Sequence, residues 1–163
     1  MSDAPRYVKW FNDPEVNKYM SVRKISLKEE RIYIRSRMVG KMKDNINLAI
    51  ETKGGEHIGT VGLEINRQNN RAVFGIIIGE KKYWSKGIGT EAAVLIIDYA
   101  FKKLKLHRLE LDVYDYNPRA QGLYAKLGFK TEGAKREHNL YKGKYKKVMY
   151  MGLLNSDWKK QKH

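Results

Sequence analysis

Two segments of the chain carry residues whose types and spacing could do chemistry. The first is a glycine loop, Gly87-Ile88-Gly89-Thr90, between an apolar stretch that ends near Ile78 and an amphipathic stretch that follows. Glycine lets backbone amides face outward without obstruction by a Cβ atom. The start of a helix adds N–H groups without helical partners and the positive end of the helix dipole. The loop therefore predicts a site for a phosphate or pyrophosphate.

Other interpretations of the glycine loop are weaker. Gly87-x-Gly89-x-x-Ala92 satisfies the loose dinucleotide-binding pattern, but that pattern needs a strand that ends almost at the first glycine. Here seven residues, Glu80 to Lys86, intervene. No Gly-x4-Gly-Lys-Ser/Thr string occurs, which excludes a nucleoside-triphosphate loop. For two glycines alone, a plain strand-to-helix connection would be the better interpretation.

The second segment is Asn117-Pro118-Arg119-Ala120-Gln121-Gly122-Leu123-Tyr124-Ala125-Lys126-Leu127-Gly128-Phe129. It closely resembles the Asn-x-x-Ala-x-x-Leu-Tyr-x-Lys-x-Gly-Phe signature of the GNAT superfamily of acetyl-CoA-dependent N-acetyltransferases. The glycine loop resembles that family's Gln/Arg-x-x-Gly-x-Gly/Ala pyrophosphate loop, with Trp84 in place of the glutamine or arginine. The order and spacing of the two motifs, with one strand between them, also match the family.

Two further segments resemble one branch of that family. Trp10-x-Asn12-Asp13-Pro14-Glu15-Val16 and Glu132-Gly133-x-x-Arg136 look like the branch that contains ribosomal-protein alanine N-acetyltransferases and spermidine N-acetyltransferase. The family usually has a strand before its first helix, whereas this chain begins almost at that helix. Either the strand is absent or the chain is a truncated version.

The resemblance implies acetyl-CoA as co-substrate and assigns its contacts. The pantetheine arm would lie between the strands Ala72–Ile78 and His107–Tyr114, paired with the backbone of Ile78 and Gly79. A backbone N–H there would polarise the thioester carbonyl, which is often worth roughly 3–4 kcal/mol of barrier. The amides of Lys86, Gly87, Ile88, Gly89 and Thr90 would hold the pyrophosphate. Lys86, Arg119 and Lys126 are candidates for the adenosine-side phosphates, and Trp84 and Asn117 are the remaining expected cofactor contacts. For each cation among them, a solvated surface position is the plain alternative, and Asn117 could equally be a helix cap.

Direct transfer of an acetyl group to a primary amine needs a proton donor for the thiolate and a proton acceptor for the amine. Tyr124 matches the family's proton-donating tyrosine, and a phenol is protonated at neutral pH. We nominate Glu110 as the acceptor, among the carboxylates on or beside the sheet, which are Glu64, Glu80, Glu110 and Asp112. Surface ion pairs are the plain alternative for most of these. The four histidines show no ligand spacing, so we expect no metal.

Hydrophobic periodicity supplies the elements that must position these residues. Ser26-x-x-Glu29 is a capping box, and we expect its helix to run to about Met42 with Ile32, Met38, Val39 and Met42 inward. A helix from the glycine loop to about Leu104 should bury Leu95. The expected strands are 46–50, 57–65, 72–78, 109–113, 129–136 and 146–153, and a further helix covers 117–127. The fold class is α/β (α+β), with a GNAT-like mixed central sheet flanked by helices, antiparallel N-terminal strands and then βαβαββ.

Composition bounds the rest. The 163 residues fit one domain, 1–155, with a basic tail at 156–163. The absence of cysteine excludes disulfides and a thiol nucleophile, and no apolar run is long enough to cross a bilayer. We expect a cytoplasmic protein, with no membrane partner, that is a monomer or homodimer.

The formal net charge of +15 predicts negatively charged binding partners. The resemblance implies that the acceptor contacts about Ser21–Asn45 and about Glu137–Tyr145. Because these segments are basic and would repel a polyamine, we expect the acceptor to be a protein or peptide N-terminal amine, or a small amine with a negative group. An anionic assembly such as the ribosome is a further expected partner. The alternatives are a basic nucleic-acid-binding module and a non-catalytic acyl-CoA sensor on the same fold.

Overall fold

The computed structural model describes residues 3–20, 23–38 and 44–160. The chain begins with three helices, α1 (Ala4–Asn12), α2 (Pro14–Asn17) and α3 (Leu27–Met38). The Asp13 carboxylate caps α2 by accepting hydrogen bonds from the N–H groups of Glu15 and Val16, at 2.9 and 3.4 Å. The predicted capping box opens α3. The Glu29 N–H donates to Ser26 Oγ at 3.3 Å, and the Ser26 N–H donates to Glu29 Oε2 at 2.7 Å.

The inward face of α3 differs from the prediction. Ile32 is 59% exposed, whereas Glu30 is only 5% exposed, and burial raises the pKa of its carboxyl. Helix α3 is described to Met38, short of the end expected near Met42. Val39, Met42 and the side chain of Met38 lie outside what the structure describes.

Six strands form one mixed sheet, in agreement with the predicted fold class. They are β1 (Asn45–Glu51), β2 (His57–Asn66), β3 (Arg71–Ile78), β4 (Arg108–Tyr114), β5 (Lys130–Tyr141) and β6 (Lys144–Leu154). Their order across the sheet is β1-β2-β3-β4-β6-β5. Neighbouring strands are antiparallel except β3 and β4, which are parallel.

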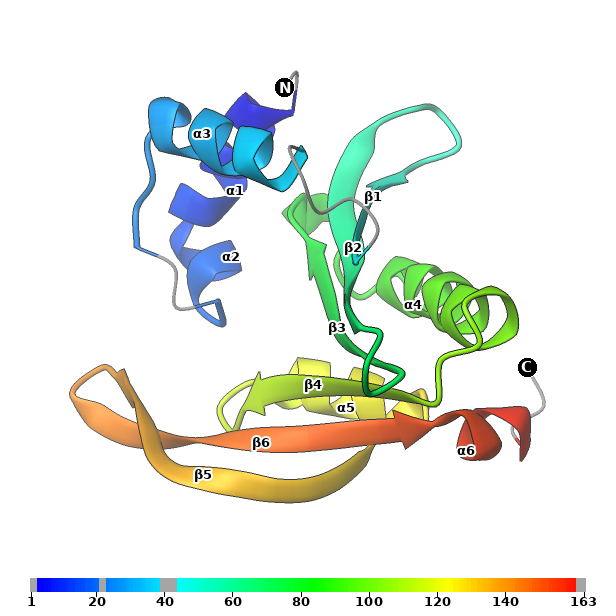
Figure 1. Cartoon of the computed structure of the whole chain (residues 1–163). Coiled ribbons are helices and arrows are strands. Elements are labelled where there is room, and N and C mark those ends of the chain that lie inside the picture. The colour runs from blue at the N-terminus through cyan, green and yellow to red at the C-terminus, as the bar shows by residue number, and fades with distance from the viewer. Residues whose placement is uncertain (1–2, 21–22, 39–43, 161–163) are drawn as a thin grey trace.

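The parallel pair separates soon after it begins. Only Arg71–Val73 of β3 pair with β4, opposite Arg108–Glu110. Beyond that point β3 stays paired with β2 as far as Ile78, and β4 stays paired with β6 as far as Tyr114. The two halves of the sheet therefore turn away from each other, and a wedge opens in the middle of the sheet (Figure 1).

Helices cover both faces of this divided sheet (Figure 1). The short 3-10 helix η1 (Lys81–Tyr83) and α4 (Ile88–Asp98) follow β3, and a π-helical turn η2 (Tyr99–Lys103) ends the predicted long helix. With α5 (Pro118–Lys126), α4 packs on the face that carries Phe74 and Leu111, whereas α1, α2 and α3 lie on the other side. Leu95 of α4 was predicted to be buried and is instead 67% exposed.

The C-terminal segment is ordered as a helix, α6 (Asn155–Lys160), rather than as the basic tail expected from residue 156. Trp158 is 3% exposed, and its indole N–H donates to Asp98 Oδ1 at 2.8 Å. This contact joins α6 to α4. Within the described residues, the helices are all too short or too polar to cross a membrane.

Candidate active site

A cavity of about 510 Å³ occupies the wedge between β3 and β4. Its walls come from the ends of both strands, from the loop before α4, from α5 and from the end of α2. The residues that line the cavity include Glu15, Tyr19, Ile76, Ile78, Trp84, Lys86, Gly87, Ile88, Gly89, Thr90, Asp112, Tyr114, Asn117, Arg119, Tyr124, His138 and Val148. The fold therefore brings both sequence motifs to one cavity.

The glycine loop presents backbone amides to this cavity. Gly87 adopts the left-handed conformation, with φ +80°, directly before α4. Its carbonyl oxygen accepts from the N–H groups of Thr90 and Glu91, at 2.9 and 3.1 Å. The N–H groups of Ile88 and Gly89 precede these first helical bonds and point out of the helix start. This is the geometry that suits a phosphate.

Trp84 ties the loop to the end of β3. Its indole N–H donates to the Ile78 carbonyl oxygen at 2.7 Å, and the Arg119 guanidinium lies 4.2 Å from the centre of its ring. The side chain in place of the family's glutamine or arginine thus has a structural part, because it links β3, the loop and α5.

The backbone of β3 explains which amides face the wedge. The Gly79 N–H donates to the Ile58 carbonyl oxygen at 2.9 Å, across the β2–β3 ladder. Peptide groups alternate in direction along a strand, so those of Ile76 and Ile78 point away from β2 toward the edge that β4 has left. The N–H of Ile78 therefore faces the wedge. The N–H of Gly79 is engaged with β2, and its Cα is covered by the buried Trp10.

Tyr124 lies on the face of α5 that closes the cavity. It is 8% exposed and makes edge contacts with Phe74 and Phe129 at centroid distances of 6.1 and 5.9 Å. Burial raises the pKa of its phenol to about 12, so the hydroxyl stays protonated at neutral pH. Asn117 caps the same helix by accepting from the Ala120 N–H at 3.2 Å, and it also lines the cavity.

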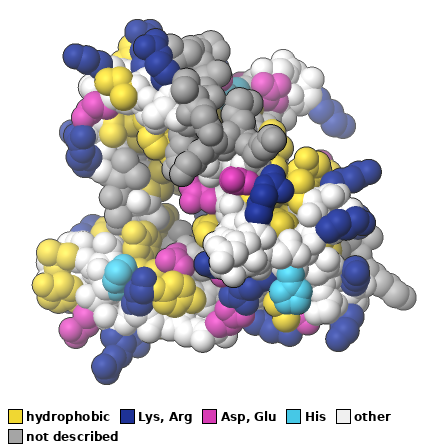
Figure 2. Space-filling view, viewed as in Figure 1, with side chains coloured by type: hydrophobic (Ala, Val, Ile, Leu, Met, Phe, Trp, Pro, Cys, Tyr) yellow, Lys and Arg dark blue, Asp and Glu magenta, His cyan; other side chains and the backbone are white. Residues whose placement is uncertain are grey.

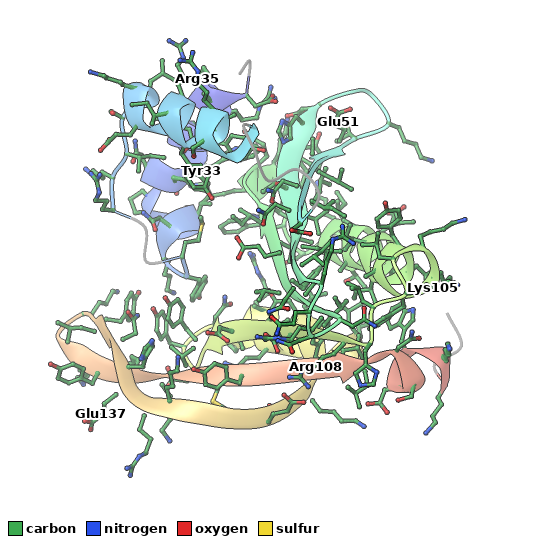
Figure 3. All side chains as sticks on the ribbon, viewed as in Figure 1. Tyr33, Arg35, Glu51, Lys105, Arg108 and Glu137 are labelled. Carbon is green, nitrogen blue, oxygen red and sulfur yellow. The ribbon has the colours of Figure 1, made fainter. Side chains whose placement is uncertain are left out.

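Besides Gly79, two predicted residues, Glu110 and Lys126, lie outside the cavity lining. Glu110 belongs to the last β3–β4 pair, and its carboxylate forms ion pairs with Arg71 and Arg108, the latter at 3.2 Å. Figure 3 shows Arg108 near the start of β4, far from the end of the β5–β6 hairpin that carries Glu137. Asp112, one alternation further on the same face, is the β4 carboxylate in the cavity. Lys126 is exposed on α5, about 200° around the helix from Tyr124.

The structure adds residues that sequence reasoning missed. Glu15 and Tyr19 reach the cavity from α2 and its C-terminal turn, and His138 and Val148 reach it from β5 and β6. Glu15 belongs to a branch motif and His138 to the segment 137–145, but no local pattern indicates that the four side chains meet, because long-range packing brings them to the site. Within the residues that the structure describes, no group of three His, Cys, Asp or Glu side chains is placed to hold a metal ion.

Comparison with known proteins agrees with this geometry. The acetyltransferase (GNAT) domain family matches residues 1–130. The chain belongs to the GNAT acetyltransferase family. As a member of that family it is an acetyl-CoA-dependent N-acetyltransferase, as the two motifs predicted.

Several relatives of this GNAT acetyltransferase are similar over most of its length. An uncharacterized N-acetyltransferase, p20, from Bacillus licheniformis is 31% identical over 97% of this chain and 90% of the relative. The spermidine N(1)-acetyltransferase of Escherichia coli (strain K12) is 42% identical over 64% of this chain and 56% of its own. The crystal structure of spermidine N-acetyltransferase from Vibrio cholerae in complex with CoA and spermine is 28% identical, with a TM-score of 0.88, and covers 97% of this chain and 93% of that chain.

Proposed function

We propose that this N-acetyltransferase binds acetyl-CoA in the wedge and passes the acetyl group directly to a primary amine that enters from the side of α2 and the β5–β6 hairpin. One observation carries the proposal: a single cavity is lined by the loop amides, by the part of β3 that β4 has left and by the Tyr124 side chain. The bound thioester would supply an activated acyl group, and the protein residues would orient it.

Each group of residues has a separate role that follows from its position in the cavity. The N–H groups of Ile88 and Gly89 suit the pyrophosphate, with Lys86 and Arg119 beside them. The N–H of Ile78 faces the wedge and would donate a hydrogen bond to the thioester carbonyl oxygen, which polarises the carbonyl group. As the carbon–sulfur bond breaks, the Tyr124 hydroxyl would donate its proton to the departing thiolate.

Asp112 replaces Glu110 as our candidate for receiving the amine. It lines the cavity from the face that α1, α2 and α3 cover, opposite the helix that carries Tyr124. A carboxylate there orients an ammonium group and accepts its proton directly or through a water molecule. Glu110 would instead act as a positioning residue, because its ion pairs with Arg71 of β3 and Arg108 of β4 join the two strands where the wedge begins.

The charges around the entrance favour a protein or peptide N-terminal amine as the acceptor. The β5–β6 hairpin, which reaches the cavity, carries several lysines. Arg23 and Lys24 are exposed just before α3, and Lys28, Arg31 and Arg35 are exposed on α3, outside the cavity lining. Such an entrance disfavours a second positive charge on the acceptor. A polyamine is the second candidate, because Glu15 and Asp112 line the cavity and two relatives are named as spermidine N-acetyltransferases.

An acceptor panel separates the two candidates. The protein would be incubated with acetyl-CoA and with short peptides, spermidine or spermine, and initial rates of thiol release would give kcat/KM for each. We expect the highest kcat/KM for a peptide, with the acetyl group found on its N-terminal amine by mass spectrometry. A kcat/KM for spermidine above that of every peptide would overturn the peptide preference, and Asp112→Asn should slow either reaction.

A further inference from the structure

One face of the β5–β6 hairpin continues directly from the cavity. Val148, which lines the cavity, is paired with Tyr114 of β4, so both side chains lie on the same face of the sheet. Side chains alternate along a strand, and Lys146 and Lys144 therefore share the face of Val148. At about 3.3 Å per residue they lie about 7 and 13 Å further along β6.

Stacked tyrosines occupy the same face of the hairpin. Tyr116 stacks on Tyr114 and on Tyr141 at centroid distances of 5.1 and 4.3 Å. Tyr141 pairs with Lys144 across the hairpin, and Asn139, the partner of Lys146, donates to the Tyr116 hydroxyl at 2.9 Å. The stacked tyrosines and the Asn139 hydrogen bond thus stabilise the face of the hairpin that carries Lys144 and Lys146.

This hairpin carries positive charge that no carboxylate balances. Residues 135–147 include six basic side chains and one acidic side chain, Glu137. Elsewhere lysines are paired, as Lys81 is with Asp13 and Glu15, but in the part of the chain that is described none of the hairpin's six forms an ion pair with a carboxylate. Figure 2 shows hydrophobic and basic side chains together over this end of the molecule.

We propose that Lys144 and Lys146 form a subsite for carboxylates of the acceptor, so that the preferred acceptor is a peptide with acidic side chains a few residues after its N-terminal amine. The inference rests on the proposed function. The amine would lie at Asp112, the first residues would cross Tyr114 and Val148, and the following side chains would reach the two ammonium groups. An extended peptide advances at the same rate per residue as β6.

Three peptides of one length, which differ only at residues 3–6, test the subsite. These positions would carry Glu, Gln or Lys, and kcat/KM would be measured at saturating acetyl-CoA in low salt. We expect the Glu peptide to exceed the Gln peptide several-fold and the Lys peptide at least tenfold, with the difference reduced at high salt. A Lys144→Glu/Lys146→Glu variant should reverse the order, whereas the charge-matched control Lys53→Glu/Lys103→Glu should keep it.

Calorimetric binding of the same peptides distinguishes failure of the lysine subsite from failure of the proposed peptide acceptor. Equal binding and equal rates for the three peptides would overturn the subsite and leave the N-acetyltransferase proposal intact. Tighter binding of the Glu peptide, lost in Lys144→Glu/Lys146→Glu but without acetylation of any peptide, would support the subsite and overturn the peptide acceptor. An unchanged order of rates in that variant would also overturn the subsite.

Discussion

The indole N–H of Trp84 donates a hydrogen bond to the Ile78 carbonyl oxygen at 2.7 Å. Ile78 is the last residue of β3, and its own N–H faces the wedge. Trp84 begins the loop whose backbone amides suit a phosphate. In the proposed complex, the bond therefore fixes the distance between the region for the pyrophosphate and the region for the thioester of one acetyl-CoA molecule. We regard it as the structural link between cofactor binding and catalysis.

Replacing Trp84 by Phe tests this link. Phenylalanine keeps a ring for Arg119 but cannot donate to Ile78. A net hydrogen bond contributes about 0.5–1.5 kcal/mol, so we expect the Kd for acetyl-CoA to rise roughly two- to twelvefold. Calorimetric titration would measure it. An unchanged Kd would show that the loop is held by other contacts.

Tyr124→Phe tests the proton donor. The variant keeps the ring that packs against Phe74 and Phe129 and removes only the hydroxyl. Positioned acids contribute about 10²–10⁴-fold to rates, so we expect kcat to fall by that order with little change in acetyl-CoA affinity. The matched control is Tyr99→Phe, since Tyr99 is 43% exposed on η2. Equal kcat values for the two variants would rule out Tyr124 as the acid.

Part of the site was predictable because it is local in sequence. The loop amides and the position of Tyr124 follow from motifs on one helix start and one helix face. The choice between Glu110 and Asp112 does not, because both alternate onto the same face of β4. What decides between them is where β3 leaves β4, and this depends on packing across the whole sheet.

The same limit applies to helix faces. The segment of α4 is apolar at Ala92, Ala93, Val94, Leu95, Ile96 and Ile97, so its sequence does not single out one buried stripe. Leu95 turned outward, whereas Ile96 and Ile97 entered the core. The charged neighbours of Trp158 likewise predict a basic tail, although its large ring packs beside Phe101.

The close approach of Trp10 to Gly79 predicts a sharp difference between two glycines of one segment. A Cβ atom on Gly79 would lie 2.0 Å from Cδ2 of the buried Trp10, whereas one on Gly75 would meet open space. Overpacking of this kind costs about 1–3 kcal/mol, so Gly79→Ala should lower the free energy of unfolding by at least that amount. Gly75→Ala should stay within about 0.5 kcal/mol. Urea denaturation of both variants would measure this, and similar midpoints would contradict the packing described.

The capping box of α3 predicts a pH-dependent stability. Hydrogen bonds from the Ser26 N–H and hydroxyl, and then from Arg23, lower the pKa of Glu29 to about 2. A lowered pKa stabilises the fold above the unfolded value of 4.5, and this contribution is lost as the pH falls toward about 2. Glu29→Gln should therefore be less stable than the parent protein at pH 7, and the gap should close between pH 4.5 and 2. Glu51→Gln, on the exposed part of β1, controls for the loss of one charge. A gap that stays constant across that range would refute the assignment.

Thiol release from acetyl-CoA in the presence of an amine tests the central claim most directly. The protein would be mixed with acetyl-CoA and a pool of peptide and polyamine acceptors, while free thiol and acetylated amine are quantified together. The wedge, its loop amides and Tyr124 predict one acetylated amine for each thiol released, with the rate reduced at least a hundredfold in Tyr124→Phe. Binding of acetyl-CoA without transfer to any amine, or no binding at all, would contradict the account.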